Sequence, residues 1–267
     1  MWKKCSFLVI TVLLLMGCNI PPKQQLLILC TNDSHSQVEP NGDFGGFAAR
    51  VELVDSMRTI YPLSLLFDAG DMVQGTPYFN FYHGRVEVEA YNRLGYDAVT
   101  LGNHEFDMGL DTLAMWLRLA SFSVVSCNYD VKGTPLDTIV KPYAIFNKGG
   151  LKIAVIGFGV SPRSLILPSN FEPIKYLDPV ERGNFYADSL RNAGCNFIVA
   201  LSHLGYYSNN VGDSMLAVQS RNIDLILGGH THEVEIDTVL NNLDNKPVKV
   251  MQTHKAGLKM DKVVVEY

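Results

Sequence analysis

The sequence predicts a single α/β domain. Short apolar runs, as expected of buried strands, alternate along the chain with amphipathic segments that follow helical spacing. No internal repeat, low-complexity tract or convincing linker divides the chain. With 267 residues, 47% of them hydrophobic and 18% charged, the chain can bury a sizeable core and is neither disordered nor collagen-like.

The expected elements follow in chain order. The predicted buried strands are the apolar runs at 26–31, 65–67, 98–101, 124–126, 153–158, 197–201 and 225–227. Two helices are indicated by apolar faces, the first formed by Val51, Val54, Met57 and Arg58 and the second by Leu110, Leu113, Ala114 and Leu117. A third helix is expected to begin with Asp178 as its N-cap and Pro179 in its first turn, and to end at about Asn192. After residue 233 the pattern changes to strands at 234–240, 248–252 and 262–266, separated by polar turns.

The N-terminus has the features of a signal peptide. Lys3 and Lys4 give it a positive start, and an apolar core at 7–16 follows that is too short to span a bilayer. The core ends in Gly17 and Cys18, which resembles the lipobox of bacterial lipoproteins. In those proteins the cysteine receives a diacylglycerol and becomes the first mature residue. No later run approaches the roughly 18 apolar residues of a membrane span, so a polytopic membrane protein is excluded.

These features predict the domain boundaries. We expect residues 1–17 to be a lipoprotein signal peptide, 18–25 to be the lipidated cysteine and a polar tether, and 26–267 to be the folded domain. The protein would then be anchored to a membrane of the bacterial cell envelope, outside the cytoplasm. A plain secretory signal with an unmodified cysteine is the alternative.

Charge and cysteine content narrow the partners. The formal net charge is −5, and removal of the two signal-peptide lysines makes it more negative. Such a surface disfavours nucleic acid, so we expect no nucleic-acid partner and membrane attachment only through acyl chains.

Cys30, Cys127 and Cys195 each lie beside an apolar run, and we expect them to be buried as small hydrophobic residues. One disulfide between two of them after export is the alternative. No Cys-x-x-Cys spacing indicates a cysteine zinc site.

Five of the expected strands end in polar clusters. These clusters are Asn32-Asp33-Ser34-His35, Asp68-Ala69-Gly70-Asp71, Gly102-Asn103-His104-Glu105-Phe106-Asp107, Ser202-His203 and Gly228-Gly229-His230-Thr231-His232. Because the carboxyl ends of strands in open α/β sheets converge on one crevice, we expect the clusters to face one place. Each motif alone could be a capped turn, a core histidine or a surface loop, so the prediction depends on their occurring together.

The residue types in these clusters suit a pair of divalent metal ions. Carboxylate, imidazole and amide groups offer the oxygen and nitrogen ligands that Mn, Zn, Fe, Co or Mg accept, which leaves the identity of the metal open. A central carboxylate can bridge two ions. Two ions about 3.5–4 Å apart stabilise both the attacking and the leaving oxygen of an in-line displacement. We expect Gly70, Gly102, Gly228 and Gly229 to let the backbone turn sharply at the strand ends.

Together the clusters resemble the five-block signature of the calcineurin-like metallophosphoesterases. The segments that narrow this resemblance to the catalytic domain of the secreted 5′-nucleotidase family are 31–35, 45–50, 70–76, 102–107, 228–232 and 251–267. That family also includes UDP-sugar hydrolases and 2′,3′-cyclic-nucleotide phosphodiesterases. The resemblance covers about residues 26–267. It implies a four-layer metallophosphatase sandwich, in which two mixed β-sheets pack together and helices cover both outer faces.

The resemblance also implies a role for each motif residue. One metal ion would be held by Asp33, His35, Asp71 and His232, and the other by Asp71, Asn103, His203 and His230, with Asp71 bridging. A bridging water of lowered pKa would supply the hydroxide that attacks phosphorus. His104 would not bind metal but would contact the substrate, as Asn103 would, and stabilise developing charge while Asp107 orients its ring and favours the protonated form. The alternative is that His104 only positions Asn103.

The expected activity is metal-dependent hydrolysis of phosphate monoesters, with 5′-nucleotides or related nucleotides as first candidates. The sequence has no match to the family's C-terminal domain, which stacks the nucleobase and supplies arginines. Two alternatives follow: a catalytic subunit that needs a separate C-terminal-domain protein, or a phosphodiesterase or broad phosphoesterase without nucleotide specificity. A degenerate fold used only for binding ranks last, because all eight motif positions are intact. His83 and His254 lie outside the motifs and are expected to be surface or structural residues.

Overall fold

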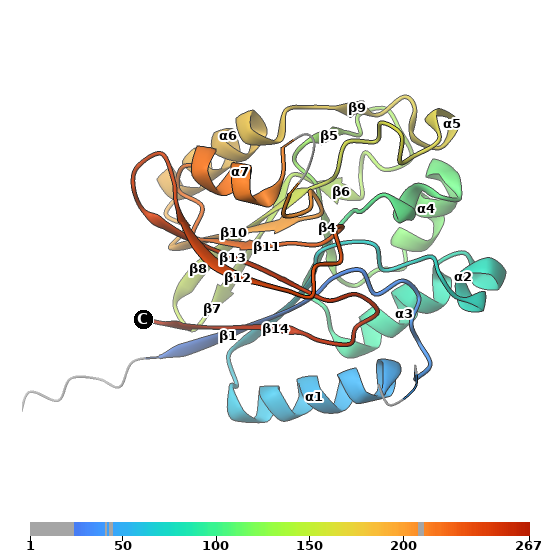
Figure 1. The fold of residues 1–267 in the computed structure, drawn as a ribbon, viewed down its shortest axis with the longest axis horizontal. Coiled ribbons are helices and arrows are strands. Elements are labelled where there is room, and N and C mark those ends of the chain that lie inside the picture. The colour runs from blue at the N-terminus through green and yellow to red at the C-terminus, as the bar shows by residue number, and fades with distance from the viewer. Residues whose placement is uncertain (1–23, 41, 43–44, 208–210) are drawn as a thin grey trace, which may run out of the picture.

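The computed structural model describes residues 24–267 apart from 41, 43–44 and 208–210. The expected signal peptide, Cys18 and most of the tether therefore lie outside the described residues. Two β-sheets lie face to face, with helices on the outer side of each (Figure 1). Within the described ranges, no helix combines the length and apolar character needed to span a membrane.

The first sheet has the strand order β14-β1-β2-β3-β4-β6. Its strands are β1 Gln25–Thr31, β2 Ser64–Asp68, β3 Ala98–Thr100, β4 Ser123–Val125, β6 Val140–Lys141 and β14 Asp261–Glu266. All neighbours are parallel except β14, which pairs antiparallel with β1. The carboxyl ends of β1, β2 and β3 therefore lie at one edge of this sheet.

The second sheet has the strand order β12-β13-β11-β10-β8-β7. Its strands are β7 Tyr143–Lys148, β8 Leu151–Phe158, β10 Phe197–Ser202, β11 Leu225–Leu227, β12 Glu235–Asn241 and β13 Pro247–Thr253. The four central strands are parallel, and the edge strands β7 and β12 are antiparallel to their neighbours. A separate antiparallel pair consists of β5 Tyr129–Asp130 and β9 Lys175–Tyr176.

The helices confirm the sequence prediction where their local signals are strong. They are α1 Gly46–Ile60, α2 Pro77–Tyr82, α3 Arg85–Leu94, α4 Gly109–Leu117, α5 Pro168–Phe171, α6 Pro179–Asn192 and α7 Asp213–Gln219, with a 3₁₀ turn at His104–Phe106. The three predicted helices are α1, α4 and α6, and the Asp178 carboxylate caps α6 by accepting the N–H of Glu181 at 2.8 Å. The short helices α2, α3, α5 and α7 and the edge strand β7 were not predicted.

Side-chain alternation along the strands builds the layers. In β1, Leu26 and Ile28 belong to the core between the sheets, while Leu27 and Leu29 belong to the core under α1, α3 and α4. A third core lies between the second sheet and the helices α6 and α7. Each fully buried leucine or isoleucine contributes about 1.5–3 kcal/mol to folding. The expected four-layer sandwich is therefore confirmed.

The three cysteines of the described chain are buried. Cys30 lies in the core between the sheets, and Cys127 and Cys195 lie under α6, and none forms a disulfide. Their predicted burial as small hydrophobic residues is confirmed.

Gly157 lies where β8 of the second sheet meets β4 of the first. A Cβ at this position would lie 2.1 Å from the carbonyl oxygen of Val125, a backbone atom that cannot rotate away. The carbonyl of Gly157 also accepts the N–H of Cys127 at 2.7 Å. A side chain here would push the two sheets apart.

Gly157→Ala is therefore expected to lower the free energy of unfolding by about 3 kcal/mol through overpacking. Gly194→Ala is the matched control, because a Cβ at Gly194 meets open space and the cost is only that of its left-handed backbone, about 1 kcal/mol. Thermal or urea unfolding of both variants measures the difference. An equal loss in the two variants would contradict the close approach of the sheets at Gly157.

Candidate metal centre

The carboxyl ends of β1, β2, β3, β10 and β11 deliver their polar clusters to one place. Three overlapping groups of side chains there have ligand atoms within 4.8 Å of one another: Asp33, His35 and His232; Asp71, His203 and His230; and His35, Asp71 and His104. Residues almost 200 positions apart thus share one site. Which ion each residue holds stays a prediction.

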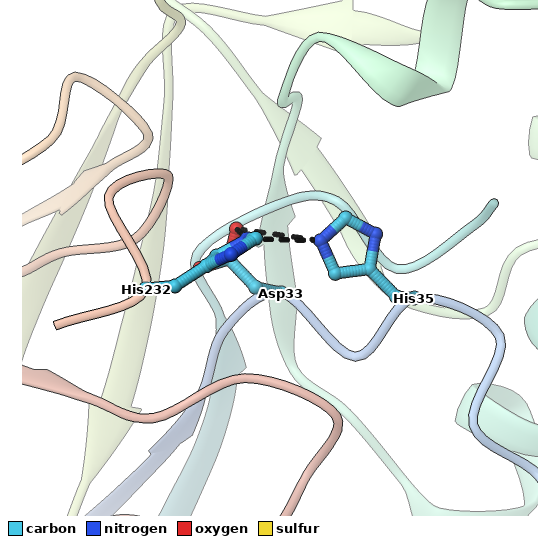
Figure 2. Close-up of side chains that lie close together, drawn as sticks. All are labelled: Asp33, His35 and His232. Atoms are coloured by element: carbon cyan, nitrogen blue, oxygen red, sulfur yellow. Dashed lines mark hydrogen bonds and ion pairs between the residues drawn. The ribbon is translucent and has the colours of Figure 1, made fainter. Parts of the chain in front are cut away.

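The first group lies around the carboxylate of Asp33. His232 Nε2 is 3.2 Å from Asp33 Oδ1, and His35 Nε2 is 3.0 Å from His232 Nε2 (Figure 2). The His35 and His232 rings approach edge-on, so both present nitrogen atoms to the same small volume (Figure 2). The three side chains come from opposite ends of the chain and could hold one ion between them.

The second group lies around the carboxylate of Asp71. His203 Nε2 is 3.1 Å from Asp71 Oδ2, and the His230 ring lies 5.1 Å from the His203 ring. His203 Nδ1 donates to the carbonyl of Ala69 at 2.7 Å, which leaves Nε2 as the ligand atom. His203 Nε2 is also 3.9 Å from Asp33 Oδ1, so the two groups are contiguous.

Two buried polar atoms indicate that these residues fit a cation. Asn103 is 6% exposed, and its Oδ1 has no hydrogen-bond partner in the described part of the chain. His203 Nε2 lies between two carboxylates, 3.1 Å from Asp71 Oδ2 and 3.9 Å from Asp33 Oδ1. Buried polar atoms are nearly always paired, and amide oxygens, carboxylates and imidazoles are ligands that a divalent ion accepts.

His104 lies at the edge of the site and is held at two points. Its backbone N–H donates to Asp71 Oδ1 at 2.9 Å, and its Nδ1 lies 2.8 Å from Asp107 Oδ2. The side chain is 30% exposed, so the ring is open to solvent on the remaining side. The structure also places His104 within ligand distance of His35 and Asp71, although the sequence interpretation gave it no metal. The pairing with Asp107 is the one that interpretation expected.

The carboxylates and His203 have strongly coupled charges. Burial alone would raise the pKa of Asp71, but the charge and hydrogen bond of His203 lower it below its ordinary value. Burial also opposes charge on His203, yet the nearby Asp71 and Asp33 raise its pKa to about 10. The pKa of Asp33 is shifted in the same direction as that of Asp71. Burial alone would raise it, but His232 and His203 lower it overall. Without metal, a proton on His203 therefore occupies the space between the carboxylates.

Three further histidines of the site, His35, His230 and His104, divide into two kinds. Burial lowers the pKa of His35, and burial together with the charge of His203 lowers that of His230 to about 4. Both are thus neutral and ready to ligate at neutral pH. For His104, burial lowers the pKa, but the hydrogen bond to Asp107 and the charge of Asp71 raise it overall. His104 is therefore the histidine at the rim that favours the protonated form.

Comparison with known proteins accords with this geometry. The sequence profile of the family described as calcineurin-like phosphoesterase matches residues 26–234. The chain belongs to this family. A snake venom 5′-nucleotidase of Gloydius brevicauda is 37% identical over 223 residues, which are 78% of this chain but 37% of that protein.

Two solved structures extend the comparison. The 5′-nucleotidase precursor of Thermus thermophilus has a TM-score of 0.82 and 34% identity, and the match covers 90% of this chain and 51% of that one. The NAD nucleotidase of Haemophilus influenzae has a TM-score of 0.83 and 29% identity, covering 92% and 53%. The chain thus spans about half the length of these relatives or less. The expected resemblance to the catalytic domain of 5′-nucleotidases is confirmed.

The calcineurin-like site is built on a strained backbone. Five expected ligands have left-handed φ values, namely Asp33 (47°), His35 (47°), Asp71 (53°), His230 (78°) and His232 (53°). Residues other than glycine rarely adopt this conformation, which costs about 1–3 kcal/mol each and is typical of functional sites. The surrounding structure must therefore hold these turns in place.

The glycines of the clusters serve close approach more than turning. Of the four that were expected to turn sharply, only Gly70 has a left-handed φ, of 93°. A Cβ on Gly102 would lie 2.1 Å from Asp71 Oδ1, and one on Gly229 would lie 3.0 Å from Asp33 Oδ2. Gly102, Gly228 and Gly229 have no left-handed φ, and their missing side chains leave room for carboxylates.

Buried side chains that the sequence analysis gave no role hold the strained turns. Glu105 is 0% exposed, and its carboxylate accepts the N–H groups of Gly102 at 2.6 Å, Asp71 at 3.1 Å and Met72 at 2.9 Å. It thus ties the turn after β2 to the turn after β3. Burial and the charge of Asp71 raise the pKa of Glu105 to about 8. Its place inside a motif was the only signal for it.

Two amides hold the other turns. Asn32 Nδ2 donates to Asp33 Oδ2 at 2.6 Å and to the carbonyl of Thr253 at 3.0 Å. When the Gln252 amide is oriented to satisfy both of its ends, its oxygen accepts the N–H of His232 at 3.2 Å and its nitrogen donates to Gly229 at 3.3 Å. Gln252 lies on β13, outside the five clusters, so no sequence signal identified it as a support.

Metal binding is expected to release a proton and to tighten as pH rises. The pKa of His203 is raised to about 10, so the metal-free protein carries this proton at neutral pH and an ion must displace it. Calorimetric titration with Mn²⁺ in buffers of different ionisation enthalpy measures the released protons. In His203→Asn the proton release should fall by close to one. Affinity that is constant from mildly acidic to mildly alkaline pH would contradict the pairing of His203 with Asp71.

Proposed function

We propose that the chain is a dinuclear metallophosphoesterase that hydrolyses phosphate monoesters, with 5′-nucleotides as its substrates. The convergence of two contiguous ligand groups around Asp33 and Asp71, beside the His104–Asp107 pair, carries this proposal. Relatives named as 5′-nucleotidases support nucleotides as the substrate class. The chain spans about half of those proteins or less, so the nucleotide preference is tested directly by the assay below.

The chain's residues divide the work of hydrolysis. Asp33, His35, Asp71 and His232 would hold one ion, and Asp71, Asn103, His203 and His230 the other. The ions, when bound, supply Lewis acidity toward a phosphoryl oxygen and a water of lowered pKa. His104, protonated and oriented by Asp107, donates a hydrogen bond to the charge that develops on the phosphoryl group, and Asn103 contacts the same group.

The test is hydrolysis of AMP by the purified, metal-loaded chain, and loss of this hydrolysis on adding a chelator.

Asp71→Ala is expected to abolish binding of both ions, because both ions share its carboxylate. His104→Ala is expected to keep both ions and to lower kcat by about 10²–10³, the effect of losing one transition-state donor. Metal content and kcat are measured on the same samples. Equal loss of metal in the two variants would refute this division of roles.

A second candidate keeps the chemistry but adds a partner. A pocket of about 600 Å³ lies beside α5, and its lining includes Leu165 and Leu167, which are 45% and 67% exposed. The side chain of Asn170 in α5 donates to the carbonyl of Asp107 at 2.9 Å, so this apolar surface adjoins the loop that carries His104 and Asp107. This observation favours a catalytic subunit that a separate C-terminal-domain protein completes. A metal-loaded chain that is inactive on AMP and on p-nitrophenyl phosphate would support this candidate over the first.

We also propose that the protein is a lipoprotein of the bacterial cell envelope, attached through Cys18. Support comes from the charged start, the short apolar core and the cysteine that follows Gly17. Acyl chains are the expected anchor, because the acidic surface disfavours anionic lipid.

Cys18→Ser is expected to move the protein from the membrane fraction to the soluble fraction and to abolish incorporation of labelled fatty acid. Cys195→Ser is the matched control, since this buried cysteine should not affect anchoring. Cell fractionation and fatty-acid labelling measure both. Membrane retention of the Cys18 variant would argue against the lipid anchor.

A further inference from the structure

Asp213 is a buried carboxylate beside the metal centre to which the mechanism above gives no role. It begins α7, and it is 0% exposed. Only one of its two oxygens has a hydrogen-bond partner among the described residues. A carboxylate in such a position costs free energy, so its contacts with its neighbours are informative.

On one side, Asp213 fixes the turn that carries His203. The hydroxyl of Ser202, the last residue of β10, donates to Asp213 Oδ1 at 2.5 Å. The same hydroxyl accepts the N–H of Leu204 at 3.2 Å, so the residues on both sides of His203 are tied to one point. The backbone N–H of Asp213 also donates to the carbonyl of Gly205, two residues after His203, at 2.8 Å.

On its other side, Asp213 packs against the strand end that carries His230. Gly228 directly follows β11, and a Cβ there would lie 2.3 Å from Asp213 Oδ2. The carboxylate thus fills the space of a missing side chain two residues before His230. Gly228 is held from behind by its own N–H, which donates to the carbonyl of Met251 at 2.8 Å.

We propose that Asp213 is a positioning residue for the second ion, the one assigned to Asp71, Asn103, His203 and His230. Asp213 holds His203 and His230 at ligand spacing through Ser202 and the backbone of Gly228. This inference rests on the proposed metal centre and adds a residue from outside the five polar clusters. In the described part of the chain, Asp213 makes no hydrogen bond or ion pair with Asp33, His35 or His232. Its loss should therefore weaken the second ion more than the first, which Asp213 reaches only indirectly, through the His230 N–H that donates to Asp33 Oδ2 at 2.9 Å.

The experiment measures Mn²⁺ binding by equilibrium dialysis in two backgrounds that each keep one ion. His35→Ala is expected to remove the first ion, the one assigned to Asp33, His35, Asp71 and His232, and to keep the second. His203→Ala is expected to remove the second ion and to keep the first. Asp213→Ala is expected to raise the dissociation constant by about 10–100-fold in the His35→Ala background, the usual effect of removing an outer support of a metal ligand. In the His203→Ala background the increase in the dissociation constant should be several-fold smaller.

Gentler variants keep the test decisive if Asp213→Ala folds poorly. Ser202→Ala removes only the hydroxyl and should weaken the second ion in the same direction by a smaller factor. Asp213→Asn keeps the volume and the acceptor for Ser202, so it should retain most of the affinity. Asp261→Ala is the matched control, because Asp261 is also a buried aspartate with one unpartnered oxygen, but lies on β14 of the first sheet.

The outcomes separate this inference from the proposed function. Unchanged affinity for the second ion in both Asp213→Ala and Ser202→Ala overturns the inference, as does equal weakening of both ions. An Asp261→Ala protein that loses the second ion to the same extent overturns it too, because the effect would then be general. A wild-type chain that binds no Mn²⁺ overturns the proposed function and the inference together.

Discussion

The buried carboxylate of Asp71 is the constraint on which the site depends. It is 2% exposed, and it contacts His203 Nε2 at 3.1 Å and the backbone N–H of His104 at 2.9 Å. A charge in this position is strongly destabilising unless partners surround it. Its partners come from the ends of β3 and β10, which belong to different sheets. One side chain therefore joins the two halves of the sandwich at the edge where both deliver ligands.

The packed sheets make this arrangement possible. The core between them is built from alternate side chains of β1, β2, β8 and β10, and its burial helps to offset the cost of five strained residues in the three turns at its edge. The supports of those turns are themselves buried: Glu105 binds two turns of the first sheet, and Gln252 holds the turn after β11. Rigidity at the site thus comes from contacts between turns, because no single turn is favourable alone.

In the proposed function, the reaction at the phosphoryl group and the recognition of the leaving group involve different surfaces. The ligand groups and the His104–Asp107 pair would all act on the phosphoryl group, which every phosphoester shares. The apolar pocket at α5 lies beside the Asp107 loop and offers a surface of a different kind. The family match therefore supports the type of reaction, whereas the choice of substrate depends on surfaces that vary among proteins of one fold.

The amino-acid sequence was enough to predict the apolar strands, the capped helix α6 and the polar cluster after each of five strands, because each is a local pattern of neighbouring residues. It missed α2 and β7, whose short sequences carry no clear period. The left-handed turns at the ligands and the parts played by Glu105, Gln252 and Asp213 can be seen only in the folded chain. The physical reason is that these parts are contacts between turns distant in the chain, and such contacts exist only once the two sheets have packed.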